Sequence, residues 1–196
     1  AVLDGSMKVG LATGQLERLA SADGVARVSL RDLGQILAGR TTGATTVAAT
    51  MFAAHRSGIP VFATGGIGGV HRGDDGDVSA DLTALATIPV AVVCAGAKAI
   101  LDVPRTVEAL ETLGVPTVGY CTDAFCEFWS PGRDLPVGAR ADHPAGAAAL
   151  LDAHSSTGLA SRVVVTAPVP ARPAQPARRL AGNDVFSRRR RLPHQH

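Results

Sequence analysis

The sequence predicts an α/β fold, a mostly parallel central sheet with helices on both faces, from two alternating patterns. Short apolar, β-branched runs bounded by glycine or proline recur at residues 60–64, 90–94, 115–120 and 162–166. Stretches with helical spacing lie between and beside them, at residues 30–39, 44–57, 97–113 and 144–154. Nearly continuous apolar strands that alternate with helices are typical of a parallel sheet covered on both faces.

The composition is that of an ordinary globular protein. The 196 residues are 46% hydrophobic and 18% charged and include three cysteines, which excludes collagen-like, disulfide-stapled and fully disordered classes. No stretch approaches the roughly 18 apolar residues of a membrane-spanning helix, and the first residues lack the pattern of a signal peptide. We therefore expect a cytoplasmic protein with reduced thiols and a single α/β domain over residues 1–170.

The net charge of +2 hides a division of the chain. Residues 171–196 hold seven arginines against Asp184 as the one acid, so the remainder is mildly acidic. The few apolar residues of this Arg/Pro-rich segment cannot offset its ordering entropy, which predicts a disordered tail. An acidic domain favours a small-molecule substrate over a nucleic-acid or membrane partner.

A glycine-rich segment follows the first predicted strand of the sheet. Ligands of open α/β sheets bind beyond the carboxyl ends of strands, and Gly65, Gly66, Gly68 and Gly69 lie at that position. Glycines let the backbone approach a ligand and turn N–H groups toward an anion. The spacing does not match a dinucleotide fingerprint, and a flexible surface turn is the alternative.

The end of the same segment carries oxygen side chains at alternate positions, namely Asp75, Asp77, Ser79 and Asp81. Hard divalent cations prefer such ligands, so Mg²⁺ or Mn²⁺ could be held there by one or two carboxylates and water. The alternative is a solvated acidic turn that caps a helix beginning near Asp81.

Lysine is rare in this chain, which contains only Lys8 and Lys98. Lys98 stands among alanines after the strand at 90–94, where desolvation and the positive end of a helix would favour the neutral amine. A neutral amine is the nucleophile that Schiff-base chemistry requires. The alternative is a lysine that extends its ammonium group into water.

Two further motifs have weaker implications. The run from Arg40 to Val47 gathers threonine hydroxyls and free N–H groups at a helix start, which suits a phosphate but also caps helices without one. Cys121 and Cys126 are five residues apart with no matching histidine pair nearby, which argues against zinc.

Four successive segments resemble the motifs of the pseudouridine-5′-phosphate glycosidase family, which is related to indigoidine-synthase A-type proteins. They are residues 43–48, 61–73, 77–82 and 92–98, and the resemblance extends over residues 1–170. It implies an α/β enzyme, usually a homotrimer, that uses Mn²⁺. The implied reaction is reversible cleavage of the C–C glycosidic bond of pseudouridine 5′-phosphate to uracil and ribose 5-phosphate.

The resemblance also implies roles for individual residues. Lys98 falls on the nucleophile that holds the opened sugar as an imine, and Asp77 falls on the manganese ligand. The implied substrate-binding positions are Arg27, Val47, His71, Ser79, Ala80 and Asp81. Arg27 stands where the family typically has a lysine, and it can hold phosphate but cannot donate a proton at neutral pH.

The resemblance further implies a member shortened at both ends. The family's proton donor is a glutamate in a segment that precedes the part matching Ala1, and C-terminal helices follow the strand at 162–166. Two alternatives to an active glycosidase therefore remain open. One is a catalytically silent remnant that binds a sugar phosphate, and the other is an aldolase-type Schiff-base enzyme that acts on a phosphosugar.

Overall fold

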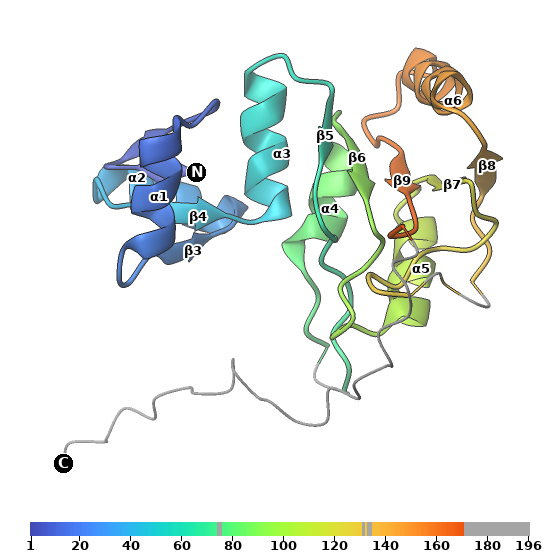
Figure 1. Cartoon of the computed structure of the whole chain (residues 1–196), viewed down its shortest axis with the longest axis horizontal. Helices are drawn as coiled ribbons and strands as arrows, with labels where there is room; N and C mark the ends of the chain where they lie inside the picture. Colours follow the sequence, from blue (N-terminus) through green and yellow to red (C-terminus); the bar gives the residue numbers. More distant parts are fainter. Residues whose placement is uncertain (74–75, 131, 133–134, 171–196) are drawn as a thin grey trace.

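The computed structural model describes residues 1–73, 76–130, 132 and 135–170. The predicted disordered tail, residues 171–196, lies outside the described residues. The chain folds into a central parallel sheet flanked by helices and a smaller N-terminal sheet beside it (Figure 1).

The central sheet has five strands in the order β5-β6-β9-β7-β8, and every neighbouring pair is parallel. Its strands are β5 (Val61–Ala63), β6 (Ala91–Cys94), β7 (Thr117–Tyr120), β8 (Ala139–Ala141) and β9 (Val164–Thr166). The helices between these strands are α4 (Ala80–Thr87), α5 (Val103–Thr112) and α6 (Pro144–Ser156). The predicted parallel α/β architecture is confirmed.

Alternate residues of the strands enter two different cores. Val92, Cys94 and Val164 pack in the main core, together with residues of α3 (Val47–Arg56), α4 and α5. Val163 and Val165 face the other way and pack beneath α6. The period of two along β6 and β9 therefore places helices on both faces of the sheet.

The N-terminal part forms a second sheet of mixed direction, in the order β2-β1-β4-β3. Its elements are β1 (Val2–Leu3), β2 (Ser6–Met7), α1 (Thr13–Ser21), β3 (Ala26–Val28), a 3-10 turn (Leu30–Asp32), α2 (Leu33–Ala38) and β4 (Gly43–Thr45). Helix α3 connects the two parts, because its Ala49 packs in the small N-terminal core while Met51 packs in the main core.

Several details of the fold differ from the sequence prediction, which included neither α1 nor β8. The strands of the N-terminal sheet were not predicted, because they are only two or three residues long and lack an apolar run. The helix predicted over 97–113 begins only at Val103, where Asp102 caps it. Residues 97–102 are held instead by bridges from Ala97 to Ile67 and from Leu101 to His71.

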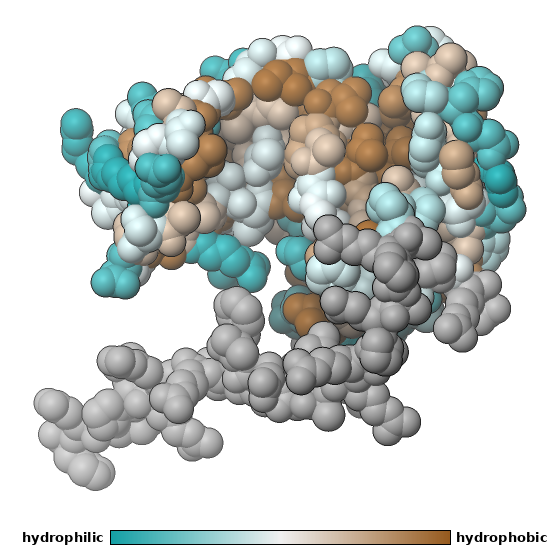
Figure 2. Space-filling model, viewed as in Figure 1, coloured by the Kyte–Doolittle hydropathy of each residue, from teal (hydrophilic) through white to brown (hydrophobic). Residues whose placement is uncertain are grey.

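One part of the sheet surface is left uncovered by helices. Val61 is 42% exposed on the edge strand β5, on the face that α6 covers at β9, β7 and β8. Figure 2 shows apolar residues gathered over this region, between α3 and α6. No helix among the described residues is long and apolar enough to cross a membrane.

A buried carboxylate connects the helical layer to the glycine-rich loop. Asp81, on the first turn of α4, is only 3% exposed. Its Oδ1 accepts the N–H of Ala48 at 2.8 Å and its Oδ2 accepts the N–H of Gly68 at 2.8 Å. Both N–H groups are buried, so the carboxylate satisfies donors that would otherwise be unpaired.

Replacement Asp81→Ala is expected to lower the free energy of unfolding by about 2 to 5 kcal/mol, because it leaves two buried N–H groups without an acceptor. Urea denaturation followed by circular dichroism measures the change. Asp152→Ala, at an exposed position of α6, is the matched control and should leave the midpoint unchanged. Equal midpoints for the two variants would contradict the structural role of Asp81.

Candidate functional site

A cleft of about 410 Å³ opens at the carboxyl ends of β5 and β6, beside the N-terminus of α3. Its lining consists of Thr45, Thr46, Val47, Thr50, Phe62, Ala63, Thr64, Gly65, Gly66, Lys98 and Phe128. Parallel α/β sheets bind ligands at this edge, as the sequence analysis assumed. The cleft combines hydroxyl groups, one cation and two aromatic rings, so it offers polar and apolar surfaces to one ligand.

The polar wall of the cleft is the start of α3. Thr46 is the N-cap residue, and its backbone N–H donates to the carbonyl of Val28 at 2.8 Å, which fixes the helix start on strand β3. The hydroxyls of Thr45 and Thr50 are hydrogen-bonded to each other at 3.0 Å. Val47 is the first helical residue, and none of the hydrogen bonds among the described residues occupies its N–H. A helix N-terminus of this kind attracts anions.

Lys98 lies in a turn between β6 and α5, where backbone bonds hold it. Its N–H donates to the carbonyl of Ile67 at 3.1 Å, and its carbonyl accepts the N–H of Leu101 at 3.0 Å. Arg72 supports the same turn, because its guanidinium donates to the carbonyls of Leu101 at 3.1 Å and Ala99 at 3.2 Å.

The environment of Lys98 differs from the one predicted. The side chain lines the cleft but is exposed, so the predicted desolvation among alanines is not found. The predicted helix start is also absent at Lys98, since α5 begins at Val103. The reason is that residues 97–101 pair with the glycine-rich loop instead of winding into a helix.

The glycines of the loop serve packing as well as the cleft. A Cβ on Gly68 would lie 2.6 Å from Oδ2 of Asp81, and one on Gly69 would clash with the side chain of Thr106. The N–H of Gly68 is already taken by Asp81. Gly65 and Gly66 of this group are among the residues that line the cleft.

His71 and Asp77 lie together, away from the lining of the cleft. Nδ1 of His71 is 4.0 Å from Oδ2 of Asp77, and the N–H of His71 donates to the carbonyl of Asp77 at 2.9 Å. The Asp77 side chain is 68% exposed. A carboxylate and an imidazole suit Mn²⁺ chemically. The described residues contain no group of three such ligands, so water or substrate would have to complete the coordination.

The other predicted binding residues take different places. Ser79 caps α4, with its hydroxyl accepting the N–H of Asp81 at 3.2 Å, and Ala80 is exposed on the first turn. Arg27 is exposed on β3, in register with Ala44. Of the predicted site residues, the described lining of the cleft includes only Lys98 and Val47.

Phe128 is the lining residue that the sequence analysis missed. It is half-buried, and its N–H donates to the carbonyl of Ala95 at 2.8 Å, three residues before Lys98. The segment that carries it has no apolar periodicity, and residues 121–126 were considered only as a zinc motif. The segment is marked by a cluster of aromatics, Phe125, Phe128 and Trp129, but such a cluster does not by itself place one ring beside Lys98.

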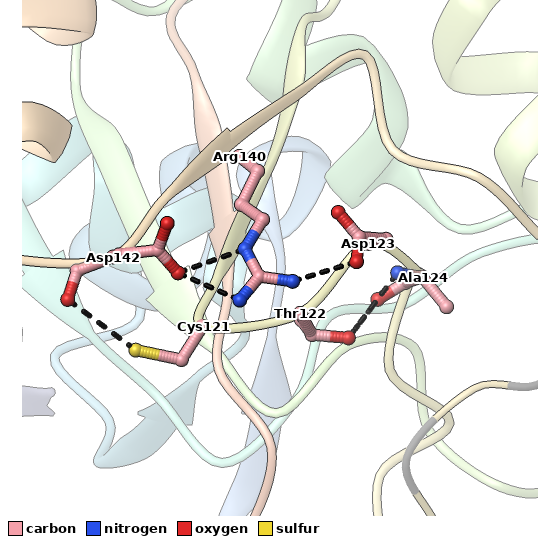
Figure 3. A network of polar contacts seen from close by, with 6 residues as sticks. All are labelled: Cys121, Thr122, Asp123, Ala124, Arg140 and Asp142. Atoms are coloured by element: carbon pink, nitrogen blue, oxygen red, sulfur yellow. Dashed lines mark hydrogen bonds and ion pairs between the residues drawn. The ribbon is translucent and has the colours of Figure 1, made fainter.

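An ionic network fixes the beginning of the loop that carries Phe128 (Figure 3). Arg140 of β8 donates to Asp142 through Nε at 2.8 Å and to Asp123 through Nη1 at 2.6 Å. These bonds, first with Asp142 and then with Asp123, raise the pKa of Arg140. Cys121 adds a bond from its Sγ to the carbonyl of Asp142.

A comparison with models of protein families shows to which family this chain belongs. The family model described as "Indigoidine synthase A like protein" matches residues 1–183. The chain belongs to this family. The match runs past residue 170, where the resemblance was expected to end.

Two curated relatives of this chain have the same protein name. Two pseudouridine-5′-phosphate glycosidases, from Methylobacterium nodulans and Jannaschia sp., are each 52% identical over 183 residues, which is 92% of this chain. The chain spans 54% and 61% of the length of these two relatives.

Solved structures of the family share the fold. The prealnumycin C-glycosynthase AlnA in complex with ribulose 5-phosphate superposes with a TM-score of 0.81 at 45% identity, over 86% of this chain and 56% of that one. An indigoidine synthase A-like protein from Thermotoga maritima also superposes with a TM-score of 0.81, at 36% identity, over 86% of this chain and 57% of that one.

The three cysteines of this family member should differ in reactivity. Burial raises the pKa of Cys94 to about 11, so at pH 8 its thiolate fraction is about 100-fold below that of an ordinary cysteine. Cys121 is exposed. Iodoacetamide at pH 8 should therefore label Cys121 first, as read by peptide mass mapping. Labelling in urea is the control that should modify Cys121, Cys94 and Cys126 alike, and early modification of Cys94 in the folded protein would contradict the assignment.

Proposed function

We propose that this chain carries the sugar-phosphate chemistry of a pseudouridine-5′-phosphate glycosidase, the reversible cleavage of pseudouridine 5′-phosphate to uracil and ribose 5-phosphate. The observation that supports it is the meeting of Lys98 with the N-terminus of α3 in one cleft. The names of the relatives and the ribulose 5-phosphate bound by the neighbouring C-glycosynthase point to the same substrate class.

The start of α3 suits the phosphate of the substrate. The hydroxyls of Thr45 and Thr46 and the N–H of Val47 lie at the positive end of the helix dipole. A phosphate held there would leave the carbon skeleton of the sugar to extend along the cleft toward Lys98.

Lys98 supplies the chemistry that a C–C glycosidic bond needs. The carbon that leaves has no lone pair to protonate, so acid catalysis alone cannot cleave the bond. The Lys98 amine displaces the ring oxygen from the anomeric carbon, and that oxygen takes up a proton. The nitrogen lone pair then forms the C=N bond of the imine as the C–C bond breaks, and the uracil carbon keeps the electrons of the broken bond and a proton from a separate donor. The exposed position of Lys98 lets a substrate reach it.

The proton for the departing uracil carbon needs a separate donor. The described lining of the cleft includes no carboxylic acid, and both oxygens of the nearby Asp81 already accept backbone N–H groups. This observation favours a second candidate function, in which the chain binds a sugar phosphate and turns it over poorly. Uracil release from pseudouridine 5′-phosphate, followed by absorbance, separates the two functions.

We also propose that Asp77 holds Mn²⁺ with His71 beside it. The ion would complete its coordination with water or substrate oxygens and would neutralise negative charge near the glycine-rich loop. The homotrimeric assembly implied by the resemblance and the cytoplasmic location expected from the sequence stay predictions, and sedimentation equilibrium tests the first.

Lys98 is expected to form a covalent adduct with ribose 5-phosphate. Borohydride reduction of the mixture should add the sugar mass to the peptide that contains Lys98, as read by mass spectrometry. Lys8→Arg is the matched control that should keep the adduct, because Lys8 is exposed outside this cleft. An adduct that persists in Lys98→Arg would exclude Lys98, since arginine stays protonated and forms no imine.

Replacement Asp77→Ala should weaken Mn²⁺ binding, because it removes the one carboxylate beside His71 that the structure describes. Isothermal titration calorimetry with MnCl₂ measures the affinity. The control is Asp152→Ala, which removes an exposed carboxylate elsewhere and should bind Mn²⁺ as the unmodified chain does. Equal affinities in all three proteins would remove Asp77 from the site.

A further inference from the structure

Phe128 occupies an unusual backbone conformation next to the reactive lysine. Its φ is +63°, in the left-handed region that non-glycine residues seldom adopt. This conformation occurs in a tight turn, where the N–H of Glu127 donates to the carbonyl of Ser130 at 3.0 Å and the N–H of Trp129 donates to the carbonyl of Glu127 at 2.8 Å.

The surroundings hold Phe128 in that conformation. Its own N–H is bonded to Ala95 at 2.8 Å, and Gly96 pairs with Glu127. Two residues earlier, the buried N–H of Cys126 donates to the hydroxyl of Thr166 at 3.1 Å. These bonds attach the turn to the Lys98 loop and to β9. The left-handed conformation of Phe128 then sets the direction of its ring.

The ring of Phe128 lies against the backbone of the glycine-rich loop. A Cβ on Gly66 would lie 2.6 Å from its Cδ2, and a Cβ on Gly65 would lie 3.6 Å from its Cε2. Trp129 packs edge-on against it, with ring centroids 4.5 Å apart and planes at 82°. The ring is half-buried and still lines the cleft.

The position of the ring indicates which part of the substrate it would contact. The threonines and the start of α3 form the polar side of the cleft, and the other aromatic, Phe62, shares a neighbouring groove with Thr45 and Thr50. Phe128 is bonded instead to the segment that carries Lys98. A base joined to the carbon that Lys98 attacks, and pointing away from a phosphate at α3, would meet Phe128.

We propose that Phe128 is the residue that receives the flat base of the substrate, so that the cleft selects a planar heteroaromatic ring on the carbon that Lys98 attacks. This assignment rests on the proposed function. Aromatic side chains stack on nucleobases with little regard to sequence, because every base has a π-face. The polar end of the cleft would therefore select the sugar phosphate, and Phe128 would select the group attached to it.

The test measures the two halves of the substrate separately on the whole chain. Saturation-transfer NMR gives the affinity for uracil alone, and borohydride trapping gives the concentration dependence of the ribose 5-phosphate adduct. Phe128→Ala should weaken uracil binding about 5- to 150-fold, which is the range measured when a stacking side chain is removed. Adduct formation should be unchanged, and Phe128→Tyr should keep the uracil affinity.

Phe52→Ala provides the matched control. Phe52 is a partly exposed phenylalanine on α3 that does not line the cleft, so its loss should change neither readout. Trp129 is the single tryptophan of the chain and packs on Phe128, so its fluorescence should respond to uracil in the unmodified protein. If Phe128→Ala fails to fold, the comparison of Phe128→Leu with Phe128→Tyr decides, with loss of uracil binding in the leucine variant alone supporting the assignment.

Three outcomes would overturn the assignment. They are unchanged uracil affinity in Phe128→Ala, a parallel loss of uracil affinity and adduct, and absence of uracil binding in the unmodified chain that still forms the adduct. Failure of the proposed function looks different, because the adduct at Lys98 would then be missing while uracil binding still depends on Phe128.

Discussion

The cleft depends on one buried carboxylate, that of Asp81. It accepts the N–H of Ala48 at the start of α3 and the N–H of Gly68 in the glycine-rich loop, both at 2.8 Å. The first of these residues belongs to the polar wall of the cleft and the second to the segment that pairs with the Lys98 turn. A buried charge is tolerated here because two backbone dipoles replace its water. The same bonds therefore join the start of α3 to the glycine-rich loop that pairs with the Lys98 turn.

The loops around the cleft are joined to one another mainly by backbone bonds. The N–H of Ala95 donates to the carbonyl of Gly65 at 3.1 Å, and the N–H of Phe128 donates to the carbonyl of Ala95 at 2.8 Å. Backbone pairing of this kind requires close approach, which explains why a Cβ at Gly66 would meet the Phe128 ring. Glycine is therefore needed at position 66 because the segment that carries Phe128 lies so close, whether or not a ligand also binds there.

Local pattern was enough to predict the frame of the fold. The apolar runs at 90–94 and 162–166 are buried strands, because burial on both faces of a sheet leaves a continuous apolar signal in the sequence. The alanine-rich segment predicted as a helix from residue 144 is α6, which begins at Pro144. The N-terminal sheet could not be predicted in this way, since strands of two or three residues carry no periodicity. Its pairing of β1 with β4 joins residues about forty positions apart, and such contacts leave no local trace.

The candidate site likewise contains residues that local sequence patterns indicate and residues that only distant contacts place. Lys98 and Val47 were found because a rare lysine after a strand and a threonine run before a helix are local signals. Asp81 was predicted as a ligand because of its carboxylate oxygens. In the structure both oxygens accept backbone N–H groups, because the carboxylate is buried and needs such partners. Phe128 was missed because its place depends on the bond to Ala95, thirty-three positions earlier in the chain. A strained aromatic held by such distant bonds is stable only because the rest of the structure fixes it. The place of Phe128 is therefore set by bonds between segments far apart in the sequence, which local pattern does not reveal.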